Sequence, residues 1–157
     1  METVALFVDV QNIYYTTRQA FKRNFDYNVF WAQATKERHV VGAFAYAIAR
    51  SDDKQKQFQN ILRAIGFEVK LKPFIQRADG SAKGDWDVGI TLDVVEYAAK
   101  VDTVVLASGD GDFDMLVSRI IQNHGVNVEV YGTEQLTANS LINAATRYIP
   151  IEGSLLL

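Results

Sequence analysis

The chain of 157 residues contains no cysteine and only two histidines. Without cysteine it can form neither a disulfide framework nor a thiolate zinc site, and it has no cysteine nucleophile. His39 and His124 do not share the ligand spacing of a histidine zinc site. No apolar run approaches the ~18 residues that a membrane-spanning helix needs, and residues 1–3 lead into a short apolar run rather than a signal peptide. We therefore expect a cytoplasmic protein without a membrane segment.

The composition is that of an ordinary globular protein. Hydrophobic residues make up 48% of the chain and charged residues 22%, which is close to the average of folded proteins and unlike a disordered chain. A chain of this length buries roughly two-thirds of its unfolded surface when it folds. We predict a single domain over residues 1–157, without a linker or an internal repeat.

The charges are distributed unevenly along the chain. The formal net charge is only −3, but residues 79–114 contain nine acids and two bases, whereas residues 18–77 contain twelve bases and five acids. A basic segment is therefore followed by an acid-rich one. Charge alone does not distinguish solvated helix faces from a binding site, so the positions of individual acids decide the interpretation.

Apolar runs alternate with longer amphipathic stretches. We predict strands at residues 4–8, 40–46, 67–71, 103–107 and 126–131, of which the first two are buried, with an edge strand at 148–151. We predict helices at residues 12–23, 28–36, 53–64, 87–100, 112–123 and 134–145. A polar loop over residues 73–85 contains a turn at Asp79–Gly80. This alternation is typical of an α/β protein with three layers, in which helices flank a mostly parallel sheet.

Acidic residues follow two of the predicted strands. Asp9 comes directly after the first strand, and Asp110 follows the fourth. In open α/β sheets, ligands bind beyond the carboxyl ends of the strands, so the two carboxylates meet if these strands are neighbours. Asp87 begins the helix before the fourth strand and can face the same place. Converging carboxylates without basic partners favour a site for Mg²⁺ or Mn²⁺, and such a site can support cleavage of phosphodiesters.

Each acid also has a purely structural interpretation. An aspartate after a strand often caps the next helix, and Asp112 is placed to cap a helix that begins at Phe113. Asp114 fits the first turn of that helix, where the dipole favours an acid. Asp93 is six positions from Asp87 and therefore points to a different face of its helix. Lys83 can contact phosphate, although an exposed loop lysine is common.

Three ordered motifs resemble the NYN domain family, in particular its LabA-like branch. They are FVDVQN at Phe7–Asn12, KGDWDVG at Lys83–Gly89 and ASGDGDF at Ala107–Phe113. The resemblance covers about residues 4–150 and implies a PIN-like Rossmannoid fold. The chain departs from the family pattern at Val10–Gln11, where relatives often have a glycine beside the aspartate, and at Thr146, where many carry an acid.

The resemblance implies a ribonuclease-like site that depends on Mg²⁺ or Mn²⁺. By position, Asp9, Asp87 and Asp110 are the expected metal-binding carboxylates, and Asp112 is a fourth acid of the catalytic site. Asn12 is expected to orient Asp9 or the substrate, and Ser108 to support the Asp110 loop. Asp93 matches a frequent family acid.

The leading hypothesis is a metal-dependent endoribonuclease that cleaves RNA, with single-stranded RNA expected from the resemblance. The candidate residues for binding the RNA backbone are Arg18, Lys22, Arg23, Lys54 and Lys56. One alternative is a non-catalytic module that binds RNA or a protein through the same acidic crevice. A phosphatase is disfavoured because Gln11 stands where aspartyl-nucleophile enzymes place a second aspartate. Residues 155–157, all leucine, can pack on the body of the protein, pack on a second subunit of a homo-oligomer or remain disordered.

Overall fold

The computed structural model of the chain describes residues 1–49, 52–73, 75–76, 82–83 and 85–157. The strands are β1 (Glu2–Asp9), β2 (Arg38–Ala49), β3 (Glu68–Pro73), β4 (Ile75–Gln76), β5 (Ala82–Lys83), β6 (Thr103–Ala107), β7 (Asn127–Gly132) and β8 (Arg147–Pro150). The helices are α1 (Val10–Phe21), α2 (Tyr27–Ala34), α3 (Asp53–Ile65), α4 (Asp87–Ala98), α5 (Asp114–His124) and α6 (Asn139–Ala144). Three short 3₁₀ helices are η1 (Gly111–Phe113), η2 (Glu134–Leu136) and η3 (Gly153–Leu155).

Six strands form one sheet in the order β3-β2-β1-β6-β7-β8, and each neighbouring pair is parallel. The chain builds one half of the sheet outward from β1 and then returns to build the other half, so the strand order reverses between β1 and β6. The predicted mostly parallel sheet is confirmed. We call the side on which these strands end the carboxyl edge, and the side on which they begin the amino edge.

Strand β1 forms the centre of the protein, and Val4–Val8 have no exposed surface. A strand in mid-sheet of a three-layer fold is covered on both faces, which explains its unbroken apolar sequence. Successive side chains point to opposite faces: Leu6 belongs to one apolar core and Phe7 to the other. The sheet therefore separates two cores that share the same backbone.

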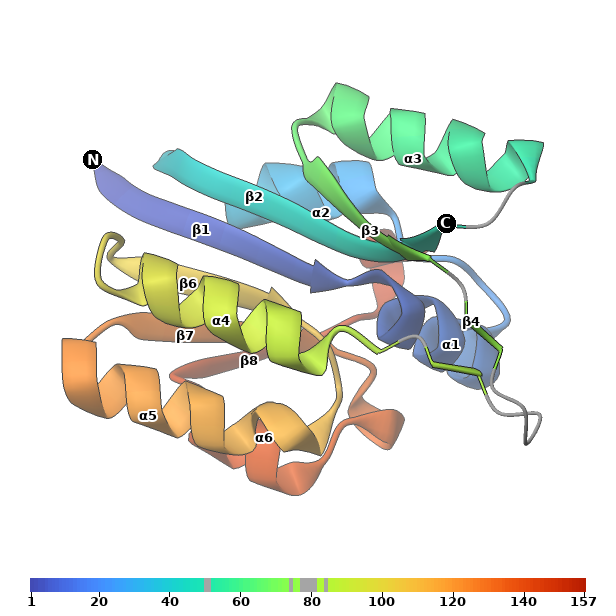
Figure 1. Cartoon of the computed structure of the whole chain (residues 1–157). Coiled ribbons are helices and arrows are strands. Elements are labelled where there is room, and N and C mark those ends of the chain that lie inside the picture. The colour runs from blue at the N-terminus through green and yellow to red at the C-terminus, as the bar shows by residue number, and fades with distance from the viewer. Residues whose placement is uncertain (50–51, 74, 77–81, 84) are drawn as a thin grey trace.

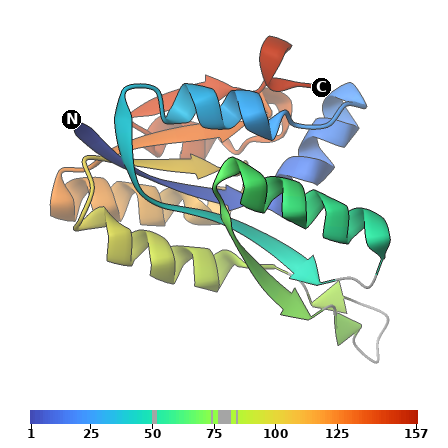
Figure 2. The same cartoon turned by 90° about the horizontal axis from the view of Figure 1, so that it is seen from above.

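Helices cover both faces of the sheet, as Figures 1 and 2 show. Ile13 of α1, Phe30 of α2 and Leu62 of α3 pack into the core that contains Leu6. Helices α4, α5 and α6 pack into the core on the opposite face. The three-layer α/β architecture predicted from the sequence is confirmed. No helix in the described part of the chain is long and apolar enough to cross a membrane.

Two predicted segments differ from the structure. The predicted helix over residues 134–145 is divided into η2 and α6, because Thr137 and Ala138 are extended between them. The predicted loop over residues 73–85 contains the short antiparallel pair β4–β5. The turn predicted at Asp79–Gly80 lies outside the described residues.

The chain's last residues pack on its own body. Leu155 and Leu156 are buried, and Leu156 forms an antiparallel bridge with Phe25. The Arg23 guanidinium donates to the carbonyls of Leu156 and Leu157 at 3.0 and 2.6 Å. Of the placements open for this tail, the structure has the one on the body of the protein.

Charges at the amino edge are paired with one another. The Arg38 guanidinium donates to both carboxylate oxygens of Glu129, at 2.9 and 2.8 Å, and lies 3.3 Å from a Glu2 carboxylate oxygen. The side chains of Arg38 and Glu129 are only 17% and 12% exposed. Glu129 and Glu2 together raise the pKa of Arg38. This bidentate pair connects β2 to β7 across the two strands between them.

Glu129→Gln is expected to lower the free energy of unfolding by about 2–3 kcal/mol, because the half-buried Arg38 loses its bidentate carboxylate. Urea denaturation of the two proteins measures the difference. Glu134→Gln, at an exposed position on η2, is the matched control and changes stability by less than about 0.5 kcal/mol. A loss for Glu129→Gln no larger than that of the control contradicts this role for the ion pair.

Candidate metal centre

The carboxyl edge brings Asp9 beside the loop that follows β6. In the parallel pairing of β1 with β6, Val8 is the partner of Ala107, so Asp9 and Ser108 leave the sheet side by side. Asp9 caps α1 by accepting from the Asn12 N–H at 3.4 Å, and it accepts from the Ser108 hydroxyl at 3.3 Å. The two acid-bearing strands are therefore neighbours, which is the condition under which Asp9 and Asp110 were expected to meet.

The loop after β6 carries two acids with different local roles. Asp110 accepts from the Asp112 N–H at 2.9 Å and thereby caps η1. Asp112 does not cap a helix beginning at Phe113, because η1 comes first and α5 starts at Asp114 without a side-chain cap. The structural interpretation of Asp112 is therefore wrong, and its carboxylate remains available to the site.

Three hydrogen bonds fix the conformation and position of this loop. The Asn12 side-chain oxygen accepts from the Gly109 N–H at 2.9 Å, and the Ser108 hydroxyl accepts from the Asp110 N–H at 3.2 Å. From the other side, Ala138 donates its N–H to the Gly109 carbonyl at 3.2 Å. The break between η2 and α6 makes this last contact possible, because an uninterrupted helix would use that N–H internally.

Residue 109 is a glycine because the surrounding backbone approaches it closely. A Cβ at Gly109 would lie 3.0 Å from the Thr137 hydroxyl oxygen and 3.1 Å from the Leu136 carbonyl oxygen. Both distances are shorter than most van der Waals contacts, and the carbonyl belongs to backbone that cannot easily move. The acid-bearing loop is thus clamped between α1 and the segment after η2.

Asp87 reaches the same region from the other side. Trp86 precedes it, donates its indole N–H to the Ala47 carbonyl of β2 at 2.9 Å, and lies under the Lys72 ammonium, 4.7 Å from the ring. The ring packs against Gly89, where a Cβ would lie 2.6 Å from it. Trp86 therefore fixes the start of α4 against β2, which positions Asp87.

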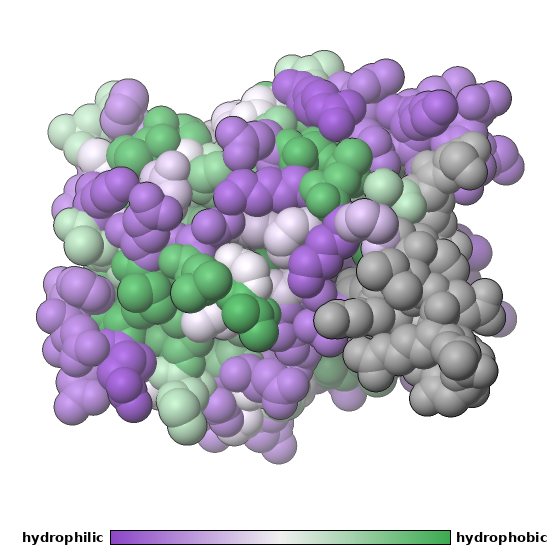
Figure 3. Space-filling view, in the orientation of Figure 1, coloured by the Kyte–Doolittle hydropathy of each residue, from purple (hydrophilic) through white to green (hydrophobic). Residues whose placement is uncertain are grey.

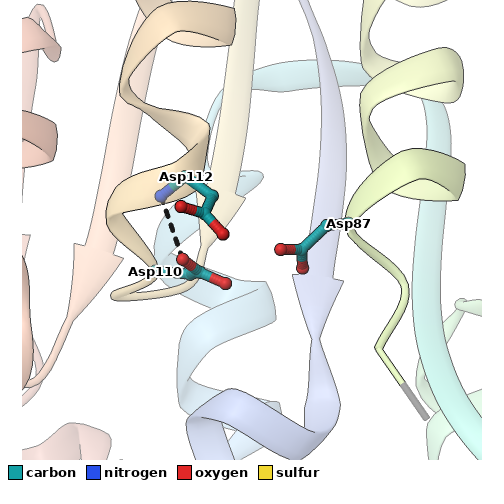
Figure 4. A group of neighbouring side chains, drawn as sticks. All are labelled: Asp87, Asp110 and Asp112. Carbon is teal, nitrogen blue, oxygen red and sulfur yellow. Dashed lines mark hydrogen bonds between the residues drawn. The ribbon is translucent and has the colours of Figure 1, made fainter. Parts of the chain in front are cut away.

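Asp87, Asp110 and Asp112 each offer a carboxylate oxygen within 4.8 Å of the other two. Figure 4 shows Asp87 pointing across the end of β1 toward Asp110 and Asp112, which project from the opposite side. Asp9 is not part of this group of three; it is buried, with an exposed fraction of 7%. Of the three expected ligands, Asp87 and Asp110 are in the cluster. Asp9 is outside it and is held by hydrogen bonds from Ser108 and Asn12.

The proximity of the acids disfavours their ionisation. Burial raises the pKa of Asp9 to about 6, and the charges of Asp110 and Asp85 add to the increase. Burial and the neighbouring charge of Asp110 raise the pKa of Asp87 to about 7, with smaller contributions from Asp85 and Asp9. At neutral pH the site therefore favours binding of either protons or cations.

Among the described side chains, no lysine, arginine or histidine forms an ion pair with Asp9, Asp87, Asp110 or Asp112. The donors are all carboxylate oxygens, which are hard ligands that suit Mg²⁺ or Mn²⁺ and not a soft metal. Proximity, raised pKa values and the missing counter-charge all fit a divalent cation.

Other predicted residues have different positions. The Asp93 carboxylate forms an ion pair with Lys70 and accepts from the Tyr46 hydroxyl, both at 2.7 Å, so it is not in the cluster. Thr146 accepts from the Val128 N–H at the amino edge, far along the strands from the acids. Arg18 is exposed on α1. Lys83 lies in β5, and its contact with phosphate stays a prediction.

Sequence reasoning missed two positioning contacts. The ring of Trp86 anchors α4, and Gly89, three residues later, was the sign of this close packing in the sequence. Asn12 was expected to orient Asp9 or the substrate, whereas its side chain binds the Gly109 N–H.

A polar cavity of about 400 Å³ is bordered by Arg38, Glu129 and Arg147. It lies at the amino edge, away from the acids.

A three-layer α/β fold with an acidic cluster at the point of strand-order reversal defines a class of proteins that bind ligands at this edge. The family model of the NYN domain matches residues 3–152. The chain therefore belongs to the NYN domain family, whose members are typically nucleases.

Two similar proteins support this assignment. The "Low amplitude and bright protein LabA" of Synechococcus elongatus (strain ATCC 33912 / PCC 7942 / FACHB-805) is 27% identical, over 94% of this chain and 83% of that protein. A crystal structure of a protein of unknown function from Vibrio parahaemolyticus RIMD 2210633 is 59% identical, with a TM-score of 0.95. That alignment covers 99% of this chain and 96% of the other.

Asp9→Asn is expected to stabilise the metal-free protein at about pH 8 by about 3 kcal/mol. The pKa of Asp9 is higher in the folded protein than in the unfolded chain, so between about pH 4 and 7 the folded protein binds more protons. The contribution of Asp9 to stability is therefore lost as the pH rises through about 6. Asparagine keeps the cap of α1 and removes this penalty. The measurement is urea denaturation in chelator across this pH range.

The difference between the variant and the wild type should shrink toward about pH 4, where both chains carry a neutral group. Asp114→Asn, on the first residue of α5 and outside the cluster, should keep the pH dependence of the wild type. An Asp9→Asn protein that loses stability in parallel with the wild type would show that Asp9 is not under electrostatic strain.

Proposed function

We propose that this NYN domain is an endoribonuclease that depends on Mg²⁺ or Mn²⁺ and cleaves phosphodiester bonds of single-stranded RNA. The observation that carries the proposal is the group formed by Asp87, Asp110 and Asp112, whose oxygens lie within 4.8 Å of one another without a paired cation among the described side chains. A group with this much uncompensated charge is costly unless it binds a cation, so it supports a functional rather than a structural role.

In the proposed site, Asp87 and Asp110 hold the cation, and Asp112 completes their group of three. Asp9, the third expected ligand, lies outside that group. When bound, the cation supplies Lewis-acid chemistry: it neutralises charge on the phosphate and makes a water molecule easier to deprotonate. Ser108 and Asn12 orient these groups, because Ser108 donates to Asp9 and Asn12 holds the backbone of the Asp110 loop.

The protein also provides the acid–base chemistry. Asp112 is the exposed member of the group of three, so its carboxylate is accessible to water and can accept the proton released by the attacking water. Asp9 is buried and accepts from Ser108 beside the acid-bearing loop, and its charge favours retention of the cation. Lys83 and Arg18 are the proposed contacts to the RNA backbone.

Incubation of the pure protein with end-labelled single-stranded RNA tests this function. With Mn²⁺ we expect cleavage products that disappear in chelator. Asp110→Asn should reduce the rate by about 100-fold or more, because it removes a ligand and one negative charge from the group. Asp114→Asn is the matched control and should retain the wild-type rate, because Asp114 is two positions beyond Asp112 in the sequence and outside the group of three.

Folding of each variant is checked by circular dichroism and thermal unfolding. If wild-type protein with Mn²⁺ binds the RNA but leaves it intact, the proposed enzyme is contradicted and the non-catalytic binding module is favoured. Cleavage that survives in Asp110→Asn at the wild-type rate would contradict the assignment of the site.

A further inference from the structure

Helix α1 exposes two consecutive tyrosines. Tyr14 is 60% exposed and Tyr15 65% exposed, and among the described side chains they are the only aromatic residues in the set of exposed large hydrophobics. Most other described aromatic rings are in contact with one another in the two cores. Burial of a tyrosine ring contributes substantially to stability, so two exposed rings at consecutive positions of one helix point to a binding partner.

The two tyrosines follow Asp9, the acid adjacent to the group of three, by five and six positions. Helix α1 begins directly after Asp9, and Asn12 in its first turn holds the Gly109 backbone of the acid-bearing loop. With about 1.5 Å of rise per residue, Tyr14 and Tyr15 are roughly one helical turn beyond Val10. A strand of RNA with its scissile phosphate at the acids would therefore place neighbouring nucleotides over this helix.

Two basic residues, Arg18 and Lys22, follow the tyrosines at helical spacing. Helix α1 contains no acid, and Arg18 follows Tyr14 and Tyr15 by four and three positions, which is the spacing of neighbours on one helix face. Lys22 follows by four more positions, and its carbonyl accepts from the Arg18 guanidinium at 3.1 Å. Within the described part of the chain neither base forms an ion pair. By contrast, Arg23 is engaged with the last two carbonyls of the chain.

The opposite side of the site has a different surface. Val88, Leu92 and Val95 of α4 are exposed and lie at helical spacing, and they contribute to the green apolar surface over α4 in Figure 3. These three side chains are aliphatic and carry neither a ring nor a charge. Rings combined with fixed positive charges on α1 favour a single-stranded nucleic acid, because bases stack on rings and phosphates bind the cations.

We propose that Tyr14 and Tyr15 form a base-stacking subsite for single-stranded RNA beside the acidic group, with Arg18 and Lys22 binding the next phosphates. This inference rests on the proposed function and deepens it. Duplex RNA cannot use the subsite, because its bases are already stacked inside the helix. The stacking contact is tolerant of sequence, since every base has an aromatic face.

The test uses fluorescence anisotropy with labelled RNA, in an Asp110→Asn background that prevents cleavage during the measurement. Replacing both tyrosines by alanine should weaken binding of single-stranded RNA by about 5- to 100-fold, the range expected for loss of a stacked base. Replacing both by phenylalanine should keep the affinity within about twofold, because phenylalanine also stacks. The pair Val88→Ala and Leu92→Ala is the matched control on α4 and should bind RNA as the background protein does.

Salt dependence separates the two parts of the subsite. Arg18→Gln should reduce the slope of log affinity against log salt by about 0.7, whereas the alanine pair should lower affinity without changing that slope. The tyrosines are exposed, so circular dichroism and thermal unfolding should match between the background protein and each variant.

The outcomes separate this inference from the proposed function. If wild-type protein cleaves RNA but the alanine pair binds as tightly as the background protein, the subsite is overturned and the proposed function stands. Equal weakening by the alanine and phenylalanine pairs also overturns stacking. If wild-type protein neither binds nor cleaves RNA, the proposed function fails and a protein partner becomes the better explanation for the exposed rings.

Discussion

The parallel pairing of β1 with β6 is the constraint on which the acidic site depends. These strands are about a hundred residues apart in the sequence, yet their register places Val8 beside Ala107. Asp9 and the Ser108–Asp110 segment consequently leave the sheet next to one another. The pairing lies at the reversal of strand order, where open α/β sheets bind their ligands. The order and register of the strands therefore determine which side chains meet at the site.

Holding like charges together requires structural support from several directions. Asn12 fixes the acid-bearing loop from α1, and the segment at Ala138 fixes it from the other side. Trp86 fixes the start of α4 against β2. Each of these contacts is made by a neutral group, so none of them cancels the charge of the site. The rigid support keeps the carboxylates at a separation that a small divalent ion can bridge.

Much of the fold and part of the site could be predicted from the sequence. The unbroken apolar run of β1 and the aspartate after it predicted a buried central strand with an acid at its end, since both depend on local pattern alone. The division at Thr137 could not be predicted, because it results from a tertiary contact with Gly109 that competes with helix formation. Likewise, the different helix face of Asp93 was visible in the sequence, but its partners Lys70 and Tyr46, which approach from β3 and β2, were not. Side chains of similar local pattern acquire different roles through their distant neighbours.

The packing of the last residues has a practical consequence for handling this protein. The Leu157 N–H donates to the Asn24 carbonyl, and the Asp26 N–H donates to the Leu155 carbonyl, so the carboxyl end lies beside the far end of α1. The amino end lies at the opposite edge of the sheet (Figure 1). An affinity tag or fusion partner joined after Leu157 would crowd the helix that carries Arg18, whereas one joined before Met1 leaves that surface open. Purification through an amino-terminal tag is accordingly the better choice for any assay of nucleic-acid binding.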